Sequence, residues 1–193
     1  MSKFSPENTL IICCDSLQEQ ERISSLLLHK HPNVIDCRLA QLEATLAGNP
    51  QAAVIAGWQQ PTAELRLIIE ICRRQNHPLL IVLRQFCSLD INRLPEKMDY
   101  VLMPGDASNT LQPWLDQARL LRRSFNNMER EIFTLSNKIN ERKVVERAKG
   151  LLMKYHQVDE DTAYKAMRNS AMQSSQSLTQ VARNLLTTLQ TFD

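Results

Sequence analysis

The hydrophobic positions of the first 110 residues form short runs separated by stretches of helical spacing. Apolar runs occur at residues 9–14, 52–56, 79–83 and 100–103, with a weaker run at 34–38. Short continuous apolar runs are typical of strands that are buried on both faces of a sheet. Their alternation with helical segments predicts an α/β domain with a five-stranded, parallel, doubly wound sheet. The helices expected between the strands span residues 17–29, 39–47, 62–75 and, as a single turn, 90–94.

A different pattern fills the middle of the chain. From residue 111 to about residue 156 the sequence predicts one long helix, in which apolar residues recur at alternating steps of three and four. This spacing is the a/d repeat of a coiled coil. We therefore expect a homodimer whose helices meet along Ala118, Leu121, Phe125, Met128, Ile132, Leu135 and Ile139. The alternative is a helix that packs on its own domain, although such helices usually carry a wider apolar face.

The C-terminal segment predicts two more helices that pack on the end of the long one. Asp159 can cap a helix that starts with two acidic residues, and Ser177 begins a capping box with Gln180. Short amphipathic helices must bury their apolar faces on each other, which predicts an all-α three-helix bundle. The expected inward residues are Val144, Val145, Ala148, Leu151, Leu152, Tyr155, Ala163, Tyr164, Met167, Ala171, Leu178, Val181, Ala182, Leu185, Leu186 and Leu189. The predicted domains are residues 1–115 (α/β), 116–140 (coiled coil) and 141–193 (bundle).

Charge and composition narrow the possible functions. The chain has 43% hydrophobic and 23% charged residues, which is ordinary for a soluble protein. Its net charge is +2, but residues 120–193 carry 12 Lys and Arg against 8 Asp and Glu, so a polyanion would meet this half. The N-terminal residues lack a signal-peptide pattern, and no apolar run approaches the roughly 18 residues of a membrane span. A cytoplasmic protein is therefore expected.

Few residues suggest catalysis, a cofactor or a metal. The chain has only four glycines, and no phosphate-binding glycine loop, nucleophile elbow or catalytic carboxylate pair is recognisable, so we expect neither an enzyme nor a cofactor. His29, His31 and Cys37 could form a metal site, but a fourth ligand is not obvious and no metal is expected. The five cysteines, which include no CxxC pair, are most simply core thiols.

Two strand ends carry a resemblance to a known signalling domain. Residues 54–61 (VIAGWQQP) and 100–104 (YVLMP) resemble the third and fifth strands of response-regulator receiver domains. In receiver domains, acidic residues after the first and third strands and a lysine in the fifth together bind Mg²⁺ and accept a phosphoryl group. The resemblance implies that this chain has the corresponding positions. Here Asp15 follows Cys14, Gly57 stands at the phosphoacceptor position and Met103 replaces the lysine. We therefore expect a pseudo-receiver in which Asp15 caps a helix instead of binding Mg²⁺.

The C-terminal segment carries a second and more specific resemblance. Residues 145–153 (VERAKGLLM), 159–164 (DEDTAY), Met167-Arg168 and Ala171-Met172 resemble the ANTAR domain of transcription antitermination regulators. Together with the pseudo-receiver and the coiled coil, they make the chain similar to the antiterminators of amidase and nitrate-assimilation operons. The resemblance implies a dimer that binds paired stem-loops of a leader RNA and thereby prevents a terminator hairpin. It also implies control by a sensor or regulatory protein.

An RNA-binding face is expected on the bundle, opposite its apolar core. A basic stripe follows one face of the first helix, with a glycine inside it, and the second helix can extend that face. The candidate contacts are Arg147, Lys149, Arg168, Lys143, Lys154, Gln173 and Gly150. Glycine within a helix costs about 1 kcal/mol relative to alanine, so RNA or the neighbouring helix is expected to approach Gly150 closely. Charge alone leaves two alternatives open: a sensor-docking interaction protein that binds no nucleic acid, and a DNA-binding response regulator.

Overall fold

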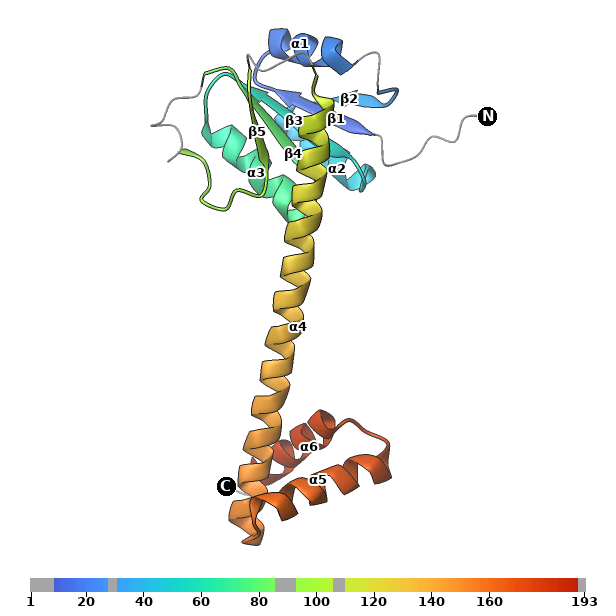
Figure 1. Cartoon of the computed structure of the whole chain (residues 1–193), viewed down its shortest axis with the longest axis vertical. Helices are drawn as coiled ribbons and strands as arrows, with labels where there is room; N and C mark the ends of the chain where they lie inside the picture. Colours follow the sequence, from blue (N-terminus) through green and yellow to red (C-terminus); the bar gives the residue numbers. More distant parts are fainter. Residues whose placement is uncertain (1–8, 28–30, 86–92, 106–109, 191–193) are drawn as a thin grey trace, which may run out of the picture. The chain divides into compact units, whose positions relative to one another are not determined.

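The structure is a computed structural model that describes residues 9–27, 31–85, 93–105 and 110–190 (Figure 1). The chain divides into two compact units, Met1–Met128 and Glu129–Asp193. A single helix, α4 (Gln112–His156), begins in the first unit and ends in the second. The predicted long helix is therefore present with nearly the predicted bounds. The turn predicted at residues 90–94 falls largely outside the described residues.

A five-stranded parallel sheet organises the first unit. Its strands are β1 (Leu10–Cys14), β2 (Val34–Asp36), β3 (Ala53–Trp58), β4 (Leu79–Leu83) and β5 (Val101–Pro104), arranged in the order β2-β1-β3-β4-β5. The helices between them are α1 (Leu17–Leu27), α2 (Leu39–Gly48) and α3 (Ala63–Arg74). This strand order is that of the flavodoxin-like doubly wound folds, which include receiver domains. The predicted fold class is confirmed.

Helices cover both faces of the sheet, so alternate residues of each strand enter different cores (Figure 1). In β3, Val54 packs in the core under α2 and α3, whereas its neighbour Ile55 packs in the core under α1 and the first turns of α4. Fully burying one aliphatic side chain of this size contributes roughly 1.5–3 kcal/mol. Because both faces are buried, the strands read as continuous apolar runs, which is why the sequence predicted them well.

The first turns of α4 belong to the α/β unit, which corrects the beginning of the predicted coiled-coil seam. Leu111, Leu115 and Ala118 are at most 2% exposed and lie in the core of the sheet, and Leu121 packs partly against the same core. Ala118 and Leu121 are therefore used by the domain itself and are not presented to a partner helix. The alternative of a helix packed on its own domain holds for this part of α4.

A buried ionic network attaches α4 to the α/β unit. Arg122 has only 3% exposure; its Nη1 lies 3.2 Å from Asp99 Oδ2, and its Nε donates to the His77 carbonyl at 3.3 Å. Arg73, from α3, binds the same carboxylate through Nε at 2.7 Å and Nη2 at 2.8 Å. Two guanidinium groups therefore share one buried carboxylate, which fixes α4 against the segment before β5 and against α3.

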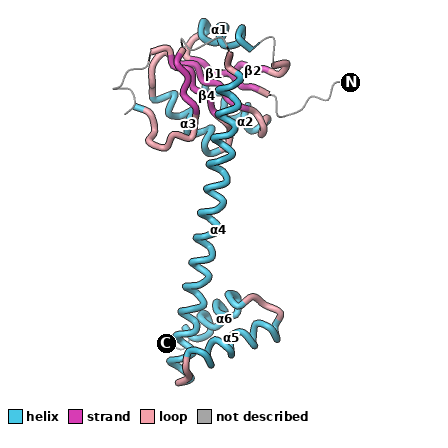
Figure 2. Tube along the Cα trace, viewed as in Figure 1, coloured by secondary structure: helices cyan, strands magenta, loops and turns pink. Residues whose placement is uncertain are grey.

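The second unit is a small helical bundle made by the end of α4, α5 (Glu160–Ser174) and α6 (Leu178–Gln190) (Figure 2). Both predicted caps are present, because Asp159 Oδ1 accepts from Thr162 N at 2.8 Å and Ser177 Oγ accepts from Gln180 N at 3.1 Å. The most buried residues of the central cluster are Ala148, Met167 and Ala182, with Val144, Val145, Leu152, Leu178, Leu185 and Leu186 packed against them.

The bundle core is smaller than the sequence predicted. Tyr155 and Tyr164, which were expected to point inward, are 40% and 42% exposed. Of the other predicted core residues, Ala163, Ala171 and Val181 are buried, Leu151 is half-buried, and the side chain of Leu189 lies outside the described part. Alanine and methionine fill the centre, so the three helices approach closely and leave no room for tyrosine rings between them.

Candidate nucleic-acid interface

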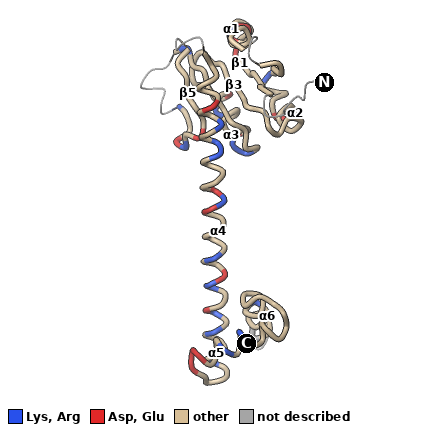
Figure 3. Tube along the Cα trace, turned by 45° about the vertical axis from the view of Figure 1, so that its right-hand side comes forward, with Lys and Arg blue, Asp and Glu red and all other residues tan. Residues whose placement is uncertain are grey.

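Basic side chains line the exposed face of the bundle opposite its core. Lys143, Arg147 and Lys154 are all exposed on α4, on the same side as Gly150. Positions separated by three, four, seven and eleven residues share one face of an α-helix, so these three cations form one stripe that Gly150 interrupts. Figure 3 shows Lys and Arg along this part of α4, with acidic residues between them. The stripe has the charge and the access that a polyanion requires.

Arg168 and Gln173 extend the polar surface on α5, and both are exposed as predicted. The structure adds two residues that the sequence pattern did not assign to this surface. Tyr164 lies four residues before Arg168 and Met172 four residues after it, with Met172 71% exposed. A cation flanked by an exposed aromatic ring and a thioether on one helix face offers both charge and a flat apolar surface. RNA loops present phosphates and unstacked bases to such surfaces.

Lys149 does not have the position that was expected of it. Only 8% of this residue is exposed, and its Nζ lies 2.5 Å from Glu146 Oε2 and 2.7 Å from Glu160 Oε1. Hydrogen bonds to Glu146 and Glu160 raise the pKa of the Lys149 amine. Because Glu160 is the first residue of α5, Lys149 joins α4 to α5 and is already neutralised by two carboxylates. We therefore remove it from the candidate RNA contacts and describe it as a positioning residue of the bundle.

Gly150 is exposed, and the neighbouring helices do not approach it. A Cβ built at this position has no other heavy atom within 4 Å once the helix's own nearby backbone is set aside. This excludes one of the two expected reasons for the glycine, close contact with a helix of the same chain. The open space beside Gly150 remains available to a ligand.

The later seam positions of α4 are exposed within one chain. Met128, Ile132, Leu135 and Ile139 are 45%, 65%, 51% and 54% exposed, and Phe125 is half-buried beside Lys97, whose Nζ lies 5.3 Å from the ring centroid. An apolar stripe of this kind on an otherwise charged helix is what the a/d repeat of a coiled coil presents to its partner. These residues carry the predicted dimerisation, which stays a prediction.

Neighbouring side chains fill the space beside Gly57, the residue predicted to stand at the receiver phosphoacceptor position. A Cβ at Gly57 would lie 2.7 Å from Ile23 Cδ1, 2.8 Å from Cys14 Sγ and 2.9 Å from Glu19 Cγ. A side chain fits there only if the side chains of Ile23, Cys14 and Glu19 move. Asp15, which was expected to cap α1, accepts instead from the backbone N–H of Gln59 at 2.7 Å, whereas Ser16 Oγ accepts from Glu19 N at 3.4 Å.

An ion-pair cluster occupies the same edge of the sheet. Glu19 is 2% exposed and binds Arg22 through both carboxylate oxygens, while Arg84 Nε donates to Glu19 Oε2 at 2.9 Å. Burial acts most strongly to raise the pKa of Glu19, but hydrogen bonds and charge from Arg22 and Arg84 hold it below its usual value. The carboxylate is thus fully paired with cations of the chain itself. It is poorly suited to bind Mg²⁺, which needs several free oxygen ligands.

The two histidines considered as metal ligands do not form a metal site in the described part of the chain. His31 Nε2 donates to Gln112 Oε1 at 2.8 Å, and His29 is not among the described residues. Within those residues, no cluster of three or more His, Cys, Asp or Glu side chains could hold a metal ion. Every helix in the same ranges is too short or too polar to cross a membrane.

The structure thus consists of a receiver-like α/β domain followed by a helical segment. This helical segment matches a known protein family. Residues 134–186 match the ANTAR domain, which confirms the predicted resemblance. The chain is 34% identical to the transcriptional regulatory protein PdtaR of Mycobacterium tuberculosis over 125 residues, covering 63% of this chain and 60% of PdtaR. It is 39% identical to the nitrate regulatory protein of Klebsiella oxytoca over 57 residues, covering 30% of this chain and 14% of that protein.

Proposed function

We propose that this chain is a transcription antitermination regulator that binds the stem-loops of a leader RNA as a dimer. The observation that carries the proposal is the ANTAR match over residues 134–186, on a bundle whose Arg147 and Arg168 are exposed. The α/β unit acts as the regulatory domain, the exposed apolar stripe of α4 from Met128 to Ile139 as the dimerisation surface, and residues 141–193 as the RNA-binding domain. A regulator of this kind holds the RNA structure that competes with the terminator hairpin, and no enzymatic step is needed.

Paired bundles suit a substrate with two stem-loops. In a dimer, binding of one stem-loop makes binding of the second intramolecular, which can raise the overall affinity by about 10²–10⁴ without new contacts. The exposed apolar stripe from Met128 to Ile139 supplies the surface for that dimer. The same stripe would equally suit a protein that only docks a sensor, so nucleic-acid binding must be tested directly.

A gel shift with the full-length chain tests the function. At one stated salt concentration, a leader RNA with two hairpins should bind more tightly than a single hairpin, and both should bind more tightly than duplex DNA of similar length. Preferential binding of duplex DNA would instead identify a DNA-binding regulator. Failure to bind either nucleic acid, by a folded dimer, would favour the sensor-docking alternative.

Variants of the exposed cations locate the RNA surface. If Arg147 meets a phosphate, Arg147→Ala should weaken binding to all hairpins alike and reduce the slope of log K against log salt by about one. If Arg168 reads a loop base, Arg168→Ala should cost roughly 1–3 kcal/mol on the cognate loop and little on a scrambled loop. Arg183→Ala, which changes an exposed arginine of α6, provides the matched control. Wild-type affinity and salt slope in both test variants would exclude this surface.

Control by a partner protein, and not by phosphorylation, is the second part of the proposal. Gly57 offers no nucleophile, and Ile23, Cys14 and Glu19 fill the space that an aspartate would need. Incubation with acetyl phosphate and Mg²⁺ should therefore leave the intact mass of the protein unchanged. Even Gly57→Asp should not restore phosphorylation, because its side chain would have to move those of Ile23, Cys14 and Glu19, and Met103 supplies no cation. A phosphoaspartate mapped to Asp15 or to any residue of the α/β unit would contradict this.

A further inference from the structure

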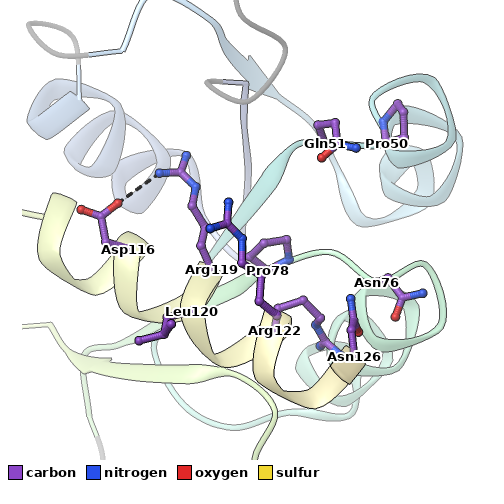
Figure 4. A pocket seen from close by; sticks show the side chains of 10 residues that line it. Pro50, Gln51, Asn76, Pro78, Asp116, Arg119, Leu120, Arg122 and Asn126 are labelled. Carbon is purple, nitrogen blue, oxygen red and sulfur yellow. Dashed lines mark hydrogen bonds and ion pairs between the residues drawn. The ribbon is translucent and has the colours of Figure 1, made fainter. Parts of the chain in front are cut away.

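A cavity of about 500 Å³ lies within the first unit, on the side of α4 that faces two loops of the α/β fold (Figure 4). Pro50 and Gln51, just before β3, form one wall, and Asn76 and Pro78, just before β4, form another. The facing residues of α4 are Asp116, Arg119, Leu120, Arg122, Arg123 and Asn126. The volume is within the range of small-molecule sites in proteins. The cavity lies at the N-terminal edge of the sheet, opposite the edge that carries Gly57.

The charges around this cavity do not balance. Arg119 Nη1 lies 3.2 Å from Asp116 Oδ1, so this pair is neutral overall. Arg122 and Arg73 both bind the carboxylate of Asp99, which is not among the residues that line the cavity. Arg123 is exposed and forms no ion pair among the described residues, so its positive charge is uncompensated. A cavity that combines three guanidinium groups with one carboxylate attracts an anion.

One buried polar atom in the walls also lacks a partner. The Oδ1 of Asn126 is buried and accepts no hydrogen bond from the described residues. A buried amide of this kind normally has a partner, either an ordered water or a ligand. Asn76, on the opposite wall, adopts a left-handed backbone conformation with φ 62, and the loop beyond it is anchored because the His77 side chain binds the Ala52 carbonyl at 2.9 Å. The walls are thus held in place by contacts outside the cavity.

We propose that this cavity is a binding site for a small anion that carries a carboxylate or phosphate group. The guanidinium groups of Arg119 and Arg123 would bind its oxygens, since arginine matches both groups with paired hydrogen bonds. The amides of Gln51, Asn76 and Asn126 would bind the rest of the molecule. A ligand held this way joins the two loops to α4 just before the helix enters the second unit. Binding of a small molecule at this site would regulate the α/β domain, which has no phosphoacceptor side chain at Gly57.

Titration of the full-length protein with inorganic phosphate and, separately, with malonate tests the site and distinguishes the two kinds of anion. Sodium chloride keeps the ionic strength constant, and binding is followed by calorimetry and by the melting temperature. At least one probe should bind saturably with one equivalent per chain and raise the melting temperature. Arg123→Gln should weaken that binding at least tenfold, and Arg119→Gln should weaken it similarly. Arg123 makes no ion pair among the described residues, so its replacement should leave the fold unchanged by circular dichroism.

Two matched variants separate this site from other basic surfaces. Arg38→Gln removes the same charge from an exposed position of the α/β unit outside the cavity, and Arg147→Gln removes it from the proposed RNA face. Both should bind the probe with wild-type affinity, while Arg147→Gln weakens RNA binding. Failure of both probes to bind at tens of millimolar would overturn the proposal, as would wild-type affinity in Arg123→Gln. Neither result would bear on RNA binding, because the cavity residues lie outside the ANTAR segment.

Discussion

At Asp99, two arginines from different helices meet a carboxylate side chain with no exposure to solvent. Burial acts most strongly on this carboxyl and would raise its pKa, but the hydrogen bonds from Arg73 and the charge of Arg122 hold the pKa below its usual value. Asp99 is therefore ionised at neutral pH. Removing one member of a buried ion pair leaves the other charge desolvated and unpaired, which is why such pairs tolerate substitution poorly.

Asp99→Asn should lower the free energy of unfolding of the α/β unit by about 3–5 kcal/mol, because it leaves buried Arg122 without a compensating charge. Urea unfolding followed by circular dichroism measures the change. Glu43→Gln provides a control at an ion pair of the same domain, since Glu43 and Arg74 are 59% and 65% exposed. That exposed pair should contribute less than about 1 kcal/mol. Equal effects of the two substitutions would show that Asp99 does not fix α4 to the domain.

His77 gives the α/β unit a dependence on pH. Burial lowers the pKa of His77 below 6.5, with the hydrogen bond to Ala52 opposing this and the charge of Arg122 adding to it. The folded state therefore keeps His77 neutral while the unfolded chain takes up a proton. Stability is fully present above pH 6.5 and is lost as pH falls towards the folded pKa, at no more than about 1.4 kcal/mol per pH unit.

The urea midpoint of the wild-type protein should thus fall as pH is lowered from about 7 to about 5. His77→Gln should flatten this part of the curve, because the titrating group is gone. Protonation of Glu19 and Asp99 affects stability only at lower pH, since the pKa of Glu19 lies below 4.5 and that of Asp99 below 3.8. An unchanged slope in His77→Gln would assign the pH dependence to another group.

Single residues were the hardest feature to predict from the sequence. Arg122 and Lys149 look like any other charged positions on a helix, yet both are buried in ion pairs. Their partners, Asp99 and Glu160, belong to other segments, so the pairing exists only once the tertiary fold has formed. By contrast, the absence of a nucleophile at Gly57 is evident from the sequence alone, because glycine lacks a side chain in any conformation. What the sequence could not indicate is that Ile23 and Glu19 fill the space.

Whole elements were predicted better, because the signals that start and stop a helix are local. The caps Thr62, Asp159 and Ser177 each bind a backbone N–H three residues further along the chain. Periodicity, however, shows only which side of a helix is apolar and not what covers it. Ala118 and Ile132 occupy equivalent positions of one repeat in α4, but the sheet domain covers Ala118 and leaves Ile132 exposed.

The ion pairs of Lys149, which join α4 to α5, lead to a prediction for the bundle. Lys149→Met keeps the length of the side chain but removes the ion pairs with Glu146 and Glu160, so the melting temperature of the C-terminal unit should fall. Lys154→Met, at an exposed position of the same helix, should leave it unchanged. At a temperature where both variants are folded, Lys149→Met should bind RNA with nearly the wild-type affinity. A large loss of RNA binding in that folded variant would restore Lys149 to the RNA surface.

For the whole molecule, the proposed dimer would present two ANTAR segments to two stem-loops. The compact units end and begin at residues 128 and 129, close to where the exposed apolar stripe starts. The chain thus has one part that folds around a sheet, one that folds as a bundle, and a helical surface left for a partner. If that partner is a second copy, affinity for paired hairpins depends on the stripe although the proposed RNA contacts lie elsewhere.

Ile132→Asp should break the dimer and with it the preference for two hairpins. Two carboxylates in a closely packed helix interface cost several kcal/mol, so the variant should sediment as a monomer at micromolar concentration. Its bundle stays folded because Ile132 is 65% exposed and lies outside the bundle core. Affinity for the two-hairpin RNA should then drop by about 10²-fold or more, towards the affinity for one hairpin, as expected when effective concentration is lost.

Phe133→Asp makes a comparable apolar-to-acidic change one residue further along α4, at a position that is 67% exposed but outside the a/d repeat. It should leave both the dimer and the two-hairpin affinity intact. If Phe133→Asp dissociates the dimer while Ile132→Asp does not, the interface lies on another face of α4. If Ile132→Asp gives a monomer that still prefers two hairpins by the wild-type factor, a single bundle must contact both stem-loops. The avidity argument would then fail although RNA binding remained, and the second hairpin would have to meet another surface of the same chain.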